Sequence, residues 1–328
     1  MATDVRRPFL ADAVGGRAPR WLRGIFIANL VAQIGIVVTG GIVRLTGSGL
    51  GCPTWPQCAE GSYIPTSRQA ESWHKYVEFG NRLLTFVLAA LALAAIVGAY
   101  AWWRRTRAAT GSARTPVLAL AAIPIVGTVV QAVLGGVTVL TGLNPWAVSA
   151  HFLVSMAIIA GCVVLVVRSG EPGDRPVTTV VRREVLLLTY ALVAVTALVV
   201  VLGVIVTGSG PHSGDADTEA RFGVDPRTMA WLHADSVLLF LGLTVGLLVA
   251  LRVTHAPARA MRFTIVLLAV SLLQGLVGYA QYFTGLPWLL VAVHMLGASL
   301  VWMLAIFVLL SMHTRGTVAS LAQPSSTA

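Results

Sequence analysis

Long apolar runs separated by short polar connections dominate the chain. Eight of these runs reach the roughly 20 residues that a helix needs to cross a hydrocarbon layer of about 30 Å. They lie at residues 25–45, 76–102, 116–140, 146–167, 185–207, 229–251, 263–283 and 288–312. The pattern predicts an all-α integral membrane protein with eight transmembrane helices.

The composition excludes a water-soluble globule, because 56% of the 328 residues are hydrophobic, 11% are charged and the mean hydropathy is +0.81. The net charge of +10 comes mainly from arginines before the first run and in alternate connections. These arginines are Arg6, Arg7, Arg17, Arg20, Arg23, Arg104, Arg105, Arg107, Arg114, Arg168, Arg175, Arg182, Arg183, Arg252, Arg259, Arg262 and Arg315. The positive-inside rule therefore places both termini in the cytoplasm of a plasma-membrane protein, with bilayer headgroups rather than nucleic acid as the partner.

A repeat relates the two halves of the chain. Six residues of the first half recur in the second half at a displacement of 143 positions. They are Gln131, Gly135, Thr141-Gly142-Leu143 and His151, which recur as Gln274, Gly278, Thr284-Gly285-Leu286 and His294. We expect two tandem, pseudo-symmetric four-helix bundles at 25–167 and 185–312, joined by a cytoplasmic linker at 168–184. Residues 1–24, which we do not expect to contain a cleaved signal peptide, and residues 313–328 form cytoplasmic tails.

The repeat draws attention to histidines near the outer ends of the predicted helices. His151 and His294 occupy matching places in the two halves, and His233 lies at a similar depth in the second half. Two histidines at one depth in a four-helix bundle can ligate a haem from both sides, so His233 and His294 are predicted axial ligands. The alternatives are hydrogen-bonded packing histidines or a zinc site, whose tetrahedral shell two histidines would leave half empty.

The first half differs from the second at the position of the partner histidine. Asn81 stands where the second half has His233, and it is flanked by Glu78 and Arg82. Asparagine ligates haem iron poorly, so a haem bound by His151 would have one protein ligand and one open face. This asymmetry predicts a catalytic first half and an electron-transferring second half.

Other polar residues lie near the same predicted site. His74 falls on the helical face of Glu78, and we expect it to bond to a haem propionate or a loop in preference to ligating iron. Arg44 and Arg82 are candidates for binding haem propionates, with snorkelling to lipid headgroups as the alternative. Cys52 and Cys58 lie in a predicted outer loop, where a disulfide is the expected state and two free thiols the alternative.

The motifs resemble those of the haem A synthase family. The resemblance rests on residues 40–53, GGIVRLTGSGLGCP, on the segment 78–82, EFGNR, and on the paired His151 and His294, and it covers all eight predicted helices. It implies an enzyme that oxidises the C8 methyl group of haem O to the formyl group of haem A for terminal oxidases, with a bound haem b. It also implies contact with the haem O synthase and with oxidase assembly factors.

Carried onto this chain, the resemblance implies specific residue roles. His233 and His294 would ligate haem b, His151 would ligate the substrate haem, and Glu78 would be catalytic, either stabilising a cationic intermediate or accepting a proton. Cys52 and Cys58 would form the family's outer-loop disulfide. Asn81 departs from the family's better-known pattern, which has a second histidine there, and resembles an actinobacterial-type variant.

Two other classes remain open from the residues alone. A dihaem b-type cytochrome that transfers electrons would share the haem-binding bundles, but it would be expected to have two complete histidine pairs. A transporter would be expected to show inverted repeats and broken helices, whereas this repeat is parallel.

Overall fold

The computed structural model describes residues 16–110, 114–215, 217 and 220–315, and within them eight helical segments are long and apolar enough to cross a membrane. The elements are α2 (Arg20–Leu45), α3 (His74–Thr110), α4 (Thr115–Ala121), α5 (Ile123–Leu140), α6 (Pro145–Ser169), β1 (Thr178–Thr179), α7 (Arg183–Ser209), α8 (Pro226–Val253), α9 (Ala258–Phe283), α10 (Trp288–Ser311) and β2 (His313–Thr314). The predicted all-α, eight-span fold is confirmed, and the chain is a multi-pass membrane protein. The N-terminal residues 1–15 and the tail from residue 316 lie outside the described part.

The helix bounds differ from the apolar runs in two places. α3 continues past residue 102 to Thr110, because helix geometry persists where hydropathy falls and arginine is a good helix former. The third span is two helices, α4 and α5, separated at Ala122. Pro124 lies in the first turn of α5, where its missing N–H disturbs least, so the chain restarts a helix there.

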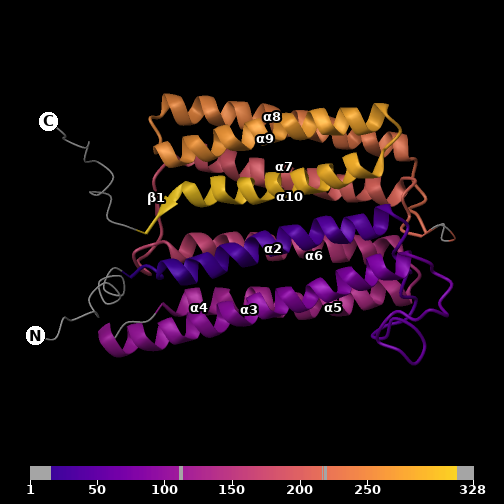
Figure 1. Ribbon diagram of the computed structural model, residues 1–328. Coiled ribbons are helices and arrows are strands. Elements are labelled where there is room, and N and C mark those ends of the chain that lie inside the picture. Colours follow the sequence, from indigo (N-terminus) through magenta and orange to yellow (C-terminus); the bar gives the residue numbers. More distant parts are fainter. Residues whose placement is uncertain (1–15, 111–113, 216, 218–219, 316–328) are drawn as a thin grey trace, which may run out of the picture.

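The helices form two groups that lie side by side (Figure 1). In the first helix group, α2 to α6, contacts join α2 to α3, α3 to α5, α5 to α6 and α6 to α2. In the second helix group, α7 to α10, contacts follow the same order, from α7 to α8, α8 to α9, α9 to α10 and α10 to α7. The pseudo-two-fold axis and the domain bounds stay predictions, although this shared order is what a duplication would produce.

α2, α6 and α10 build the core between the two groups. Buried side chains of this core are Leu30, Ile34, Val37, Met156, Ile158, Ile159, Cys162, Val163 and Ile306. The indole N–H of Trp302 on α10 donates to the carbonyl oxygen of Met156 on α6 at 2.8 Å. Met295 on α10 lies against Gly41 on α2, in the space that a Cβ would fill. Close packing and an interhelical hydrogen bond thus join the groups, as they join helices in lipid.

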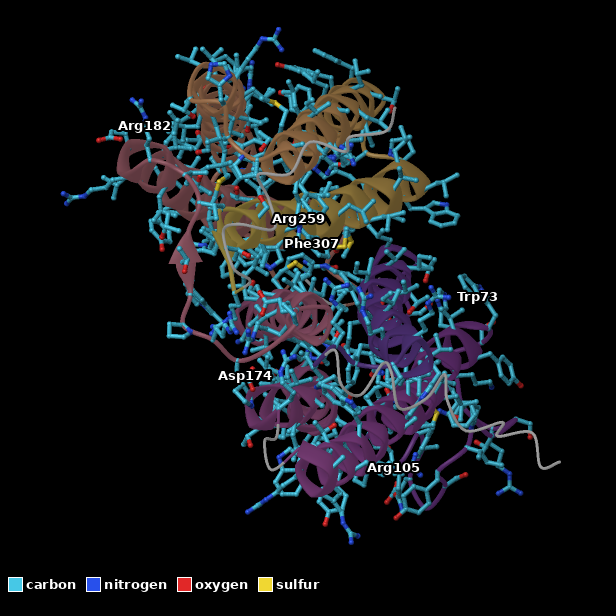
Figure 2. The ribbon with its side chains drawn as sticks, turned by 90° about the vertical axis from the view of Figure 1, so that its left-hand side faces the viewer. Trp73, Arg105, Asp174, Arg182, Arg259 and Phe307 are labelled. Carbon is cyan, nitrogen blue, oxygen red and sulfur yellow. A yellow bond between two sulfur atoms is a disulfide. The ribbon has the colours of Figure 1, made fainter. Side chains whose placement is uncertain are left out.

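One end of the molecule, here called the terminal end, carries residues 16 and 315, and Figure 2 views the molecule from it. Asp174 accepts from Arg114 at 3.0 Å and from Arg168 at 2.6 Å, and Glu171 pairs with Arg168 and, at 3.5 Å, with Arg315. β1 and β2 pair antiparallel beside this cluster. The segment between the helix groups is therefore fastened to both of them.

The opposite end, here called the disulfide end, repeats one turn in both groups. Gly142 and Leu143 between α5 and α6 have φ of 59° each, and Gly285 and Leu286 between α9 and α10 have φ of 79° and 60°. In both turns the leucine N–H donates to the carbonyl five residues back, at 2.8 Å and 2.7 Å. Leucine seldom adopts this left-handed conformation. The shared turn therefore starts α6 and α10 in the same way.

Candidate functional site

The four residues of the predicted ligand positions have matching places in their helices. His151 is the seventh residue of α6 and His294 the seventh of α10. Asn81 is the eighth residue of α3 and His233 the eighth of α8. All four lie within about 12 Å of the helix ends at the disulfide end, given a rise of 1.5 Å per residue. The structure thus supports treating Asn81 as the counterpart of His233.

His233 and His294 face each other across the second helix group. Their ring centroids are 6.4 Å apart, with an interplanar angle of 67°. Two metal–nitrogen bonds of about 2 Å, plus about 1.1 Å from each nitrogen to its ring centre, would separate the centres of two axial imidazoles by about 6.2 Å. The two rings therefore fit one metal atom between them.

A hydrogen bond determines which ring nitrogen of His233 is free to ligate a metal. Its Nδ1 lies 3.1 Å from the carbonyl oxygen of Val199 on α7. A carbonyl only accepts, so Nδ1 must carry the hydrogen, and the lone pair of the neutral ring lies on Nε2. Gly203, one turn further along α7, has no Cβ, and a Cβ there would lie 3.1 Å from His233 Cε1. α7 thus holds the His233 ring so that its Nε2 is available as a ligand, as an axial haem ligand requires.

In the first helix group, Asn81 lines a cavity of ≈ 210 Å³ between α2 and α3. The other lining residues are Thr39, Ile42, Val43, Val77 and Leu84. The side-chain oxygen of Asn81 is buried, and no hydrogen bond to it is found among the described residues. An unpaired buried carbonyl is costly, so this oxygen marks a place where a ligand could supply the missing donor.

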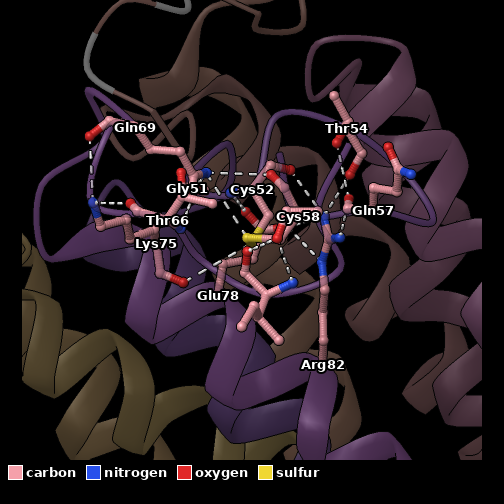
Figure 3. The surroundings of a disulfide bond; sticks show 12 residues. Gly51, Cys52, Thr54, Gln57, Cys58, Thr66, Gln69, Lys75, Glu78 and Arg82 are labelled. Atoms are coloured by element: carbon pink, nitrogen blue, oxygen red, sulfur yellow. Dashed lines mark hydrogen bonds and ion pairs between the residues drawn. A yellow bond between two sulfur atoms is a disulfide. The ribbon is translucent and has the colours of Figure 1, made fainter. Parts of the chain in front are cut away.

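Glu78 lies at the centre of a hydrogen-bonded cluster that sequence patterns did not reveal (Figure 3). Its side chain is only 7% exposed. One carboxylate oxygen accepts from the backbone N–H of Cys52 at 2.7 Å, and the other accepts from Arg82 at 2.6 Å and 3.1 Å. The Cys52–Cys58 disulfide predicted from the loop is formed. Glu78 is thus held from both sides as a carboxylate, by the disulfide loop and by an arginine one turn along α3.

Arg82 also fastens the disulfide loop to α3. Its guanidinium donates to the carbonyl oxygens of Cys52 at 2.8 Å, Thr54 at 3.1 Å and Gln57 at 2.9 Å. All these partners are protein groups, so a haem propionate would have to share or replace them. The predicted propionate role of Arg82 stays a prediction, while its role in shaping the loop is visible in the contacts.

A second anchor holds the remainder of this connection. The ammonium of Lys75, which is 6% exposed, donates to the carbonyl oxygens of Thr66 at 2.8 Å and Gln69 at 3.3 Å. The side-chain amide of Gln69 in turn donates to the carbonyl oxygen of Cys58 at 3.3 Å. These hydrogen bonds therefore hold the connection between α2 and α3 in place over the disulfide end.

Trp55, at the tip of the disulfide loop, was not singled out by sequence patterns. Its indole lies against Gly136 on α5, in the space that a Cβ would occupy. Gly135, the preceding residue, faces His151, because a Cβ there would lie 3.5 Å from Cε1 of that ring. Trp55 and His151 thus contact consecutive residues of α5. The signal that could have found it is a tryptophan next to prolines inside a short cysteine loop.

Arg44 joins the two helix groups at the disulfide end. It donates to the carbonyl oxygen of His212 at 2.8 Å and to that of Thr207, in the last turn of α7, at 3.2 Å. Burial and the nearby Arg44 charge lower the pKa of His212, so that ring is neutral near pH 7. As with Arg82, the propionate role of Arg44 stays a prediction. His74 contacts a loop, since its Nδ1 lies 2.9 Å from Ser48 Oγ.

The fold and the site define a polytopic helical membrane protein with one facing histidine pair, and with His151 and Asn81 at matching helix positions in the other helix group. A family described as Cytochrome oxidase assembly protein matches residues 23–212. The chain belongs to this family, the one that contains the haem A synthases.

Individual relatives support the same assignment. Proteins named Heme A synthase match from Alkalihalophilus pseudofirmus, 28% identical over 45% of this chain and 47% of the relative, and from Halalkalibacterium halodurans, 30% identical over 46% and 48%. The one from Lysinibacillus sphaericus is 32% identical over 44% of both chains. The chain thus matches about half the length of these curated relatives.

Proposed function

We propose that the protein is a haem A synthase, which oxidises the C8 methyl group of haem O to the formyl group of haem A with haem b as cofactor. The observation that carries the proposal is the asymmetry between the two ligand positions. His233 and His294 form a pair suited to a six-coordinate haem, whereas Asn81 has in α3 the helix position that His233 has in α8. A haem bound by His151 in the first helix group would then have one protein ligand and one open face.

In the second helix group, His233 and His294 would hold haem b. When bound, this haem would supply one-electron transfer between the substrate and an external acceptor. The protein's part is to fix both rings. Val199 keeps the hydrogen of His233 on Nδ1, and the separation of 6.4 Å between the ring centroids matches axial ligation on both sides.

In the first helix group, His151 would bind the substrate haem O, and Asn81 would face the other side of the macrocycle. The conversion removes hydrogen from a methyl carbon and adds an oxygen atom from water, so released protons need an acceptor. Glu78 is the carboxylate nearest to Asn81 in sequence on α3, one turn before Arg82. The oxygen that accepts from the Cys52 N–H keeps a second lone pair, whereas the other oxygen already accepts two bonds from Arg82. It would accept a proton or stabilise positive charge that develops on the substrate.

The proposed setting follows from the charge distribution. By the positive-inside rule, the arginines at the terminal end favour cytoplasmic termini in the plasma membrane, so the disulfide end would face the oxidising exterior, where the Cys52–Cys58 bond is stable. Haem O would arrive from the enzyme that makes it, and the product would pass to oxidase assembly factors. Arg44 and Arg82 remain the candidates for binding the haem propionates.

The proposal is tested in cells that make haem O but have no haem A synthase of their own. Expression of the wild-type chain should yield haem A in extracted pigments. Glu78→Gln should abolish the conversion, and His294→Ala should remove the low-spin b-type spectrum from purified protein. His255→Ala, at an exposed position between α8 and α9, is the matched control and should change neither result.

Other pigment patterns would point to other classes. Haem B as the sole pigment of the wild type would indicate a b-type cytochrome, and the absence of any haem would indicate a transporter. Undiminished conversion in Glu78→Gln would remove Glu78 from the mechanism.

A further inference from the structure

The helices that carry His151 and His294 each pack against a neighbour with the same two residues at the contact. On α5, Gln131 donates from its side-chain amide to the carbonyl oxygen of His151 at 3.0 Å. On α9, Gln274 donates in the same way to the carbonyl oxygen of His294 at 2.7 Å. Glutamine and histidine are 20 residues apart in both cases. The same glutamine–histidine contact therefore occurs in both halves, in each case between two consecutive helices that a short turn connects.

A glycine lies beside each of these glutamine–histidine contacts. Gly135 follows Gln131 by one helical turn on α5, and Gly278 follows Gln274 by one turn on α9, so each pair lies on one face of its helix. A Cβ at Gly278 would lie 3.2 Å from His294 Cε1 and 3.7 Å from Nδ1. A Cβ at Gly135 would lie 3.5 Å from His151 Cε1. The glutamine thus holds the backbone of the histidine, and the glycine lies directly against its ring.

These contacts are important for ring orientation, because no hydrogen bond of Nδ1 to the described residues fixes the ring of His294 or His151. Within the described residues, Nδ1 of both rings is buried and makes no hydrogen bond. His233 differs, since its Nδ1 bonds to Val199. A ligating imidazole is normally oriented by a hydrogen bond from its second nitrogen. For His294 and His151, the contacts that orient the ring among the described residues are packing contacts.

We infer that Gln131 with Gly135, and Gln274 with Gly278, are positioning residues that set the height and the rotation of the His151 and His294 rings. The inference rests on the proposed function, because it assumes that both rings ligate haem iron. The glutamine fixes the position of the histidine backbone along the helix axis. Because the glycine has no side chain, the edge of the histidine ring fits against its backbone. This close contact limits the rotation of the ring about its Cβ–Cγ bond.

The ring rotation matters to a bound haem. The orientation of an axial imidazole is one of the protein's levers on the electronic properties of the iron, together with the hydrogen bonds of that imidazole. A methyl group at position 278 would press on Cε1 and force the ring to turn or to move by a few tenths of an ångström. The haem would stay bound, but its spectrum and its midpoint potential would change.

The test compares two alanine variants of α9 in purified holoprotein. Gly278→Ala adds the methyl group against His294, whereas Gly275→Ala adds it where nothing lies within 4 Å. We expect Gly278→Ala to retain haem b at wild-type stoichiometry, with a shifted low-spin electron paramagnetic resonance signal and a shifted midpoint potential. Gly275→Ala should match the wild type in both measurements. Gln274→Leu, which removes the bond to the His294 carbonyl, should also shift both and serves if Gly278→Ala does not accumulate.

Equal behaviour of Gly278→Ala, Gln274→Leu and Gly275→Ala would overturn the inference. His294→Ala, measured in parallel, separates this result from failure of the proposed function. If His294→Ala has lost the low-spin signal while the alanine variants are alike, the ligand assignment stands and the positioning role is refuted. If His294→Ala keeps the signal, the ligand assignment fails and the inference fails with it.

Discussion

Removing the guanidinium of Arg82 should destabilise the disulfide end by more than a neutral polar contact could. Arg82→Met leaves the carboxylate of Glu78, 7% exposed, without its counter-charge, and it also frees three carbonyl oxygens of the disulfide loop. Removing one partner of a buried ion pair typically costs 3–5 kcal/mol. Because Arg82 is 23% exposed, solvent screens part of the interaction, and we expect a loss of about 3 kcal/mol at the lower end of that range.

A double-mutant cycle separates the ion pair from the loop contacts. Glu78→Gln, Arg82→Met and the double variant are unfolded with dodecyl sulfate in mixed micelles under non-reducing conditions, and the loss of helix is followed by circular dichroism. The coupling free energy between Glu78 and Arg82 should be about 2 kcal/mol. Arg262→Met, at an exposed position on α9, is the matched control and should alter the free energy of unfolding by less than about 0.5 kcal/mol.

The size of the coupling decides whether this reasoning is right. Neutral polar pairs between membrane helices couple by about 0.6 kcal/mol on average. A value no larger than that would show that the Glu78–Arg82 pair behaves as a solvated surface pair. The structural explanation for how Glu78 is held would then be wrong, even if Glu78 proved essential for activity.

Two further predictions concern the first helix group. Asn81→His should supply a second ligand opposite His151 and convert the substrate haem from high-spin to low-spin, as measured by electron paramagnetic resonance of haem O-loaded protein; an unchanged high-spin signal would show that position 81 does not face the iron. Gly136→Ala should displace the Trp55 indole and speed reduction of the buried disulfide by a water-soluble phosphine at least several-fold, whereas Gly80→Ala, with nothing within 4 Å, should leave the rate unchanged.

Much of the site follows from local patterns in the chain. Hydropathy predicts the eight spans because the requirement for about 20 apolar residues acts on each helix separately. The repeat predicts that His151 and His294 hold equivalent places, and the structure puts each at the seventh position of its helix. Asn81 and His233 likewise share the eighth position. Helix register is a local property, so spacing along the chain transfers directly into depth along the helix.

What each side chain contacts was decided by tertiary structure. Arg44 and Arg82 are basic residues near helix ends, and their sequence context suits lipid headgroups or propionates equally well. Their partners are carbonyl oxygens of loops, and in one case of the last turn of α7, that lie 25 or more residues away in the chain. Such contacts depend on how a connection folds back over the helices. No periodicity in the chain encodes that path.

The contacts of Glu78 depend both on the local sequence and on the tertiary structure. The chain places a carboxylate one turn before an arginine on α3, and at this spacing the two side chains can reach each other. The bond from the Cys52 N–H and the approach of Trp55 to Gly136 require the disulfide loop to close over α3 and α5. Sequence therefore determined which groups are present and at what depth. The fold decided which of them touch, because contact depends on distances between segments that only packing brings together.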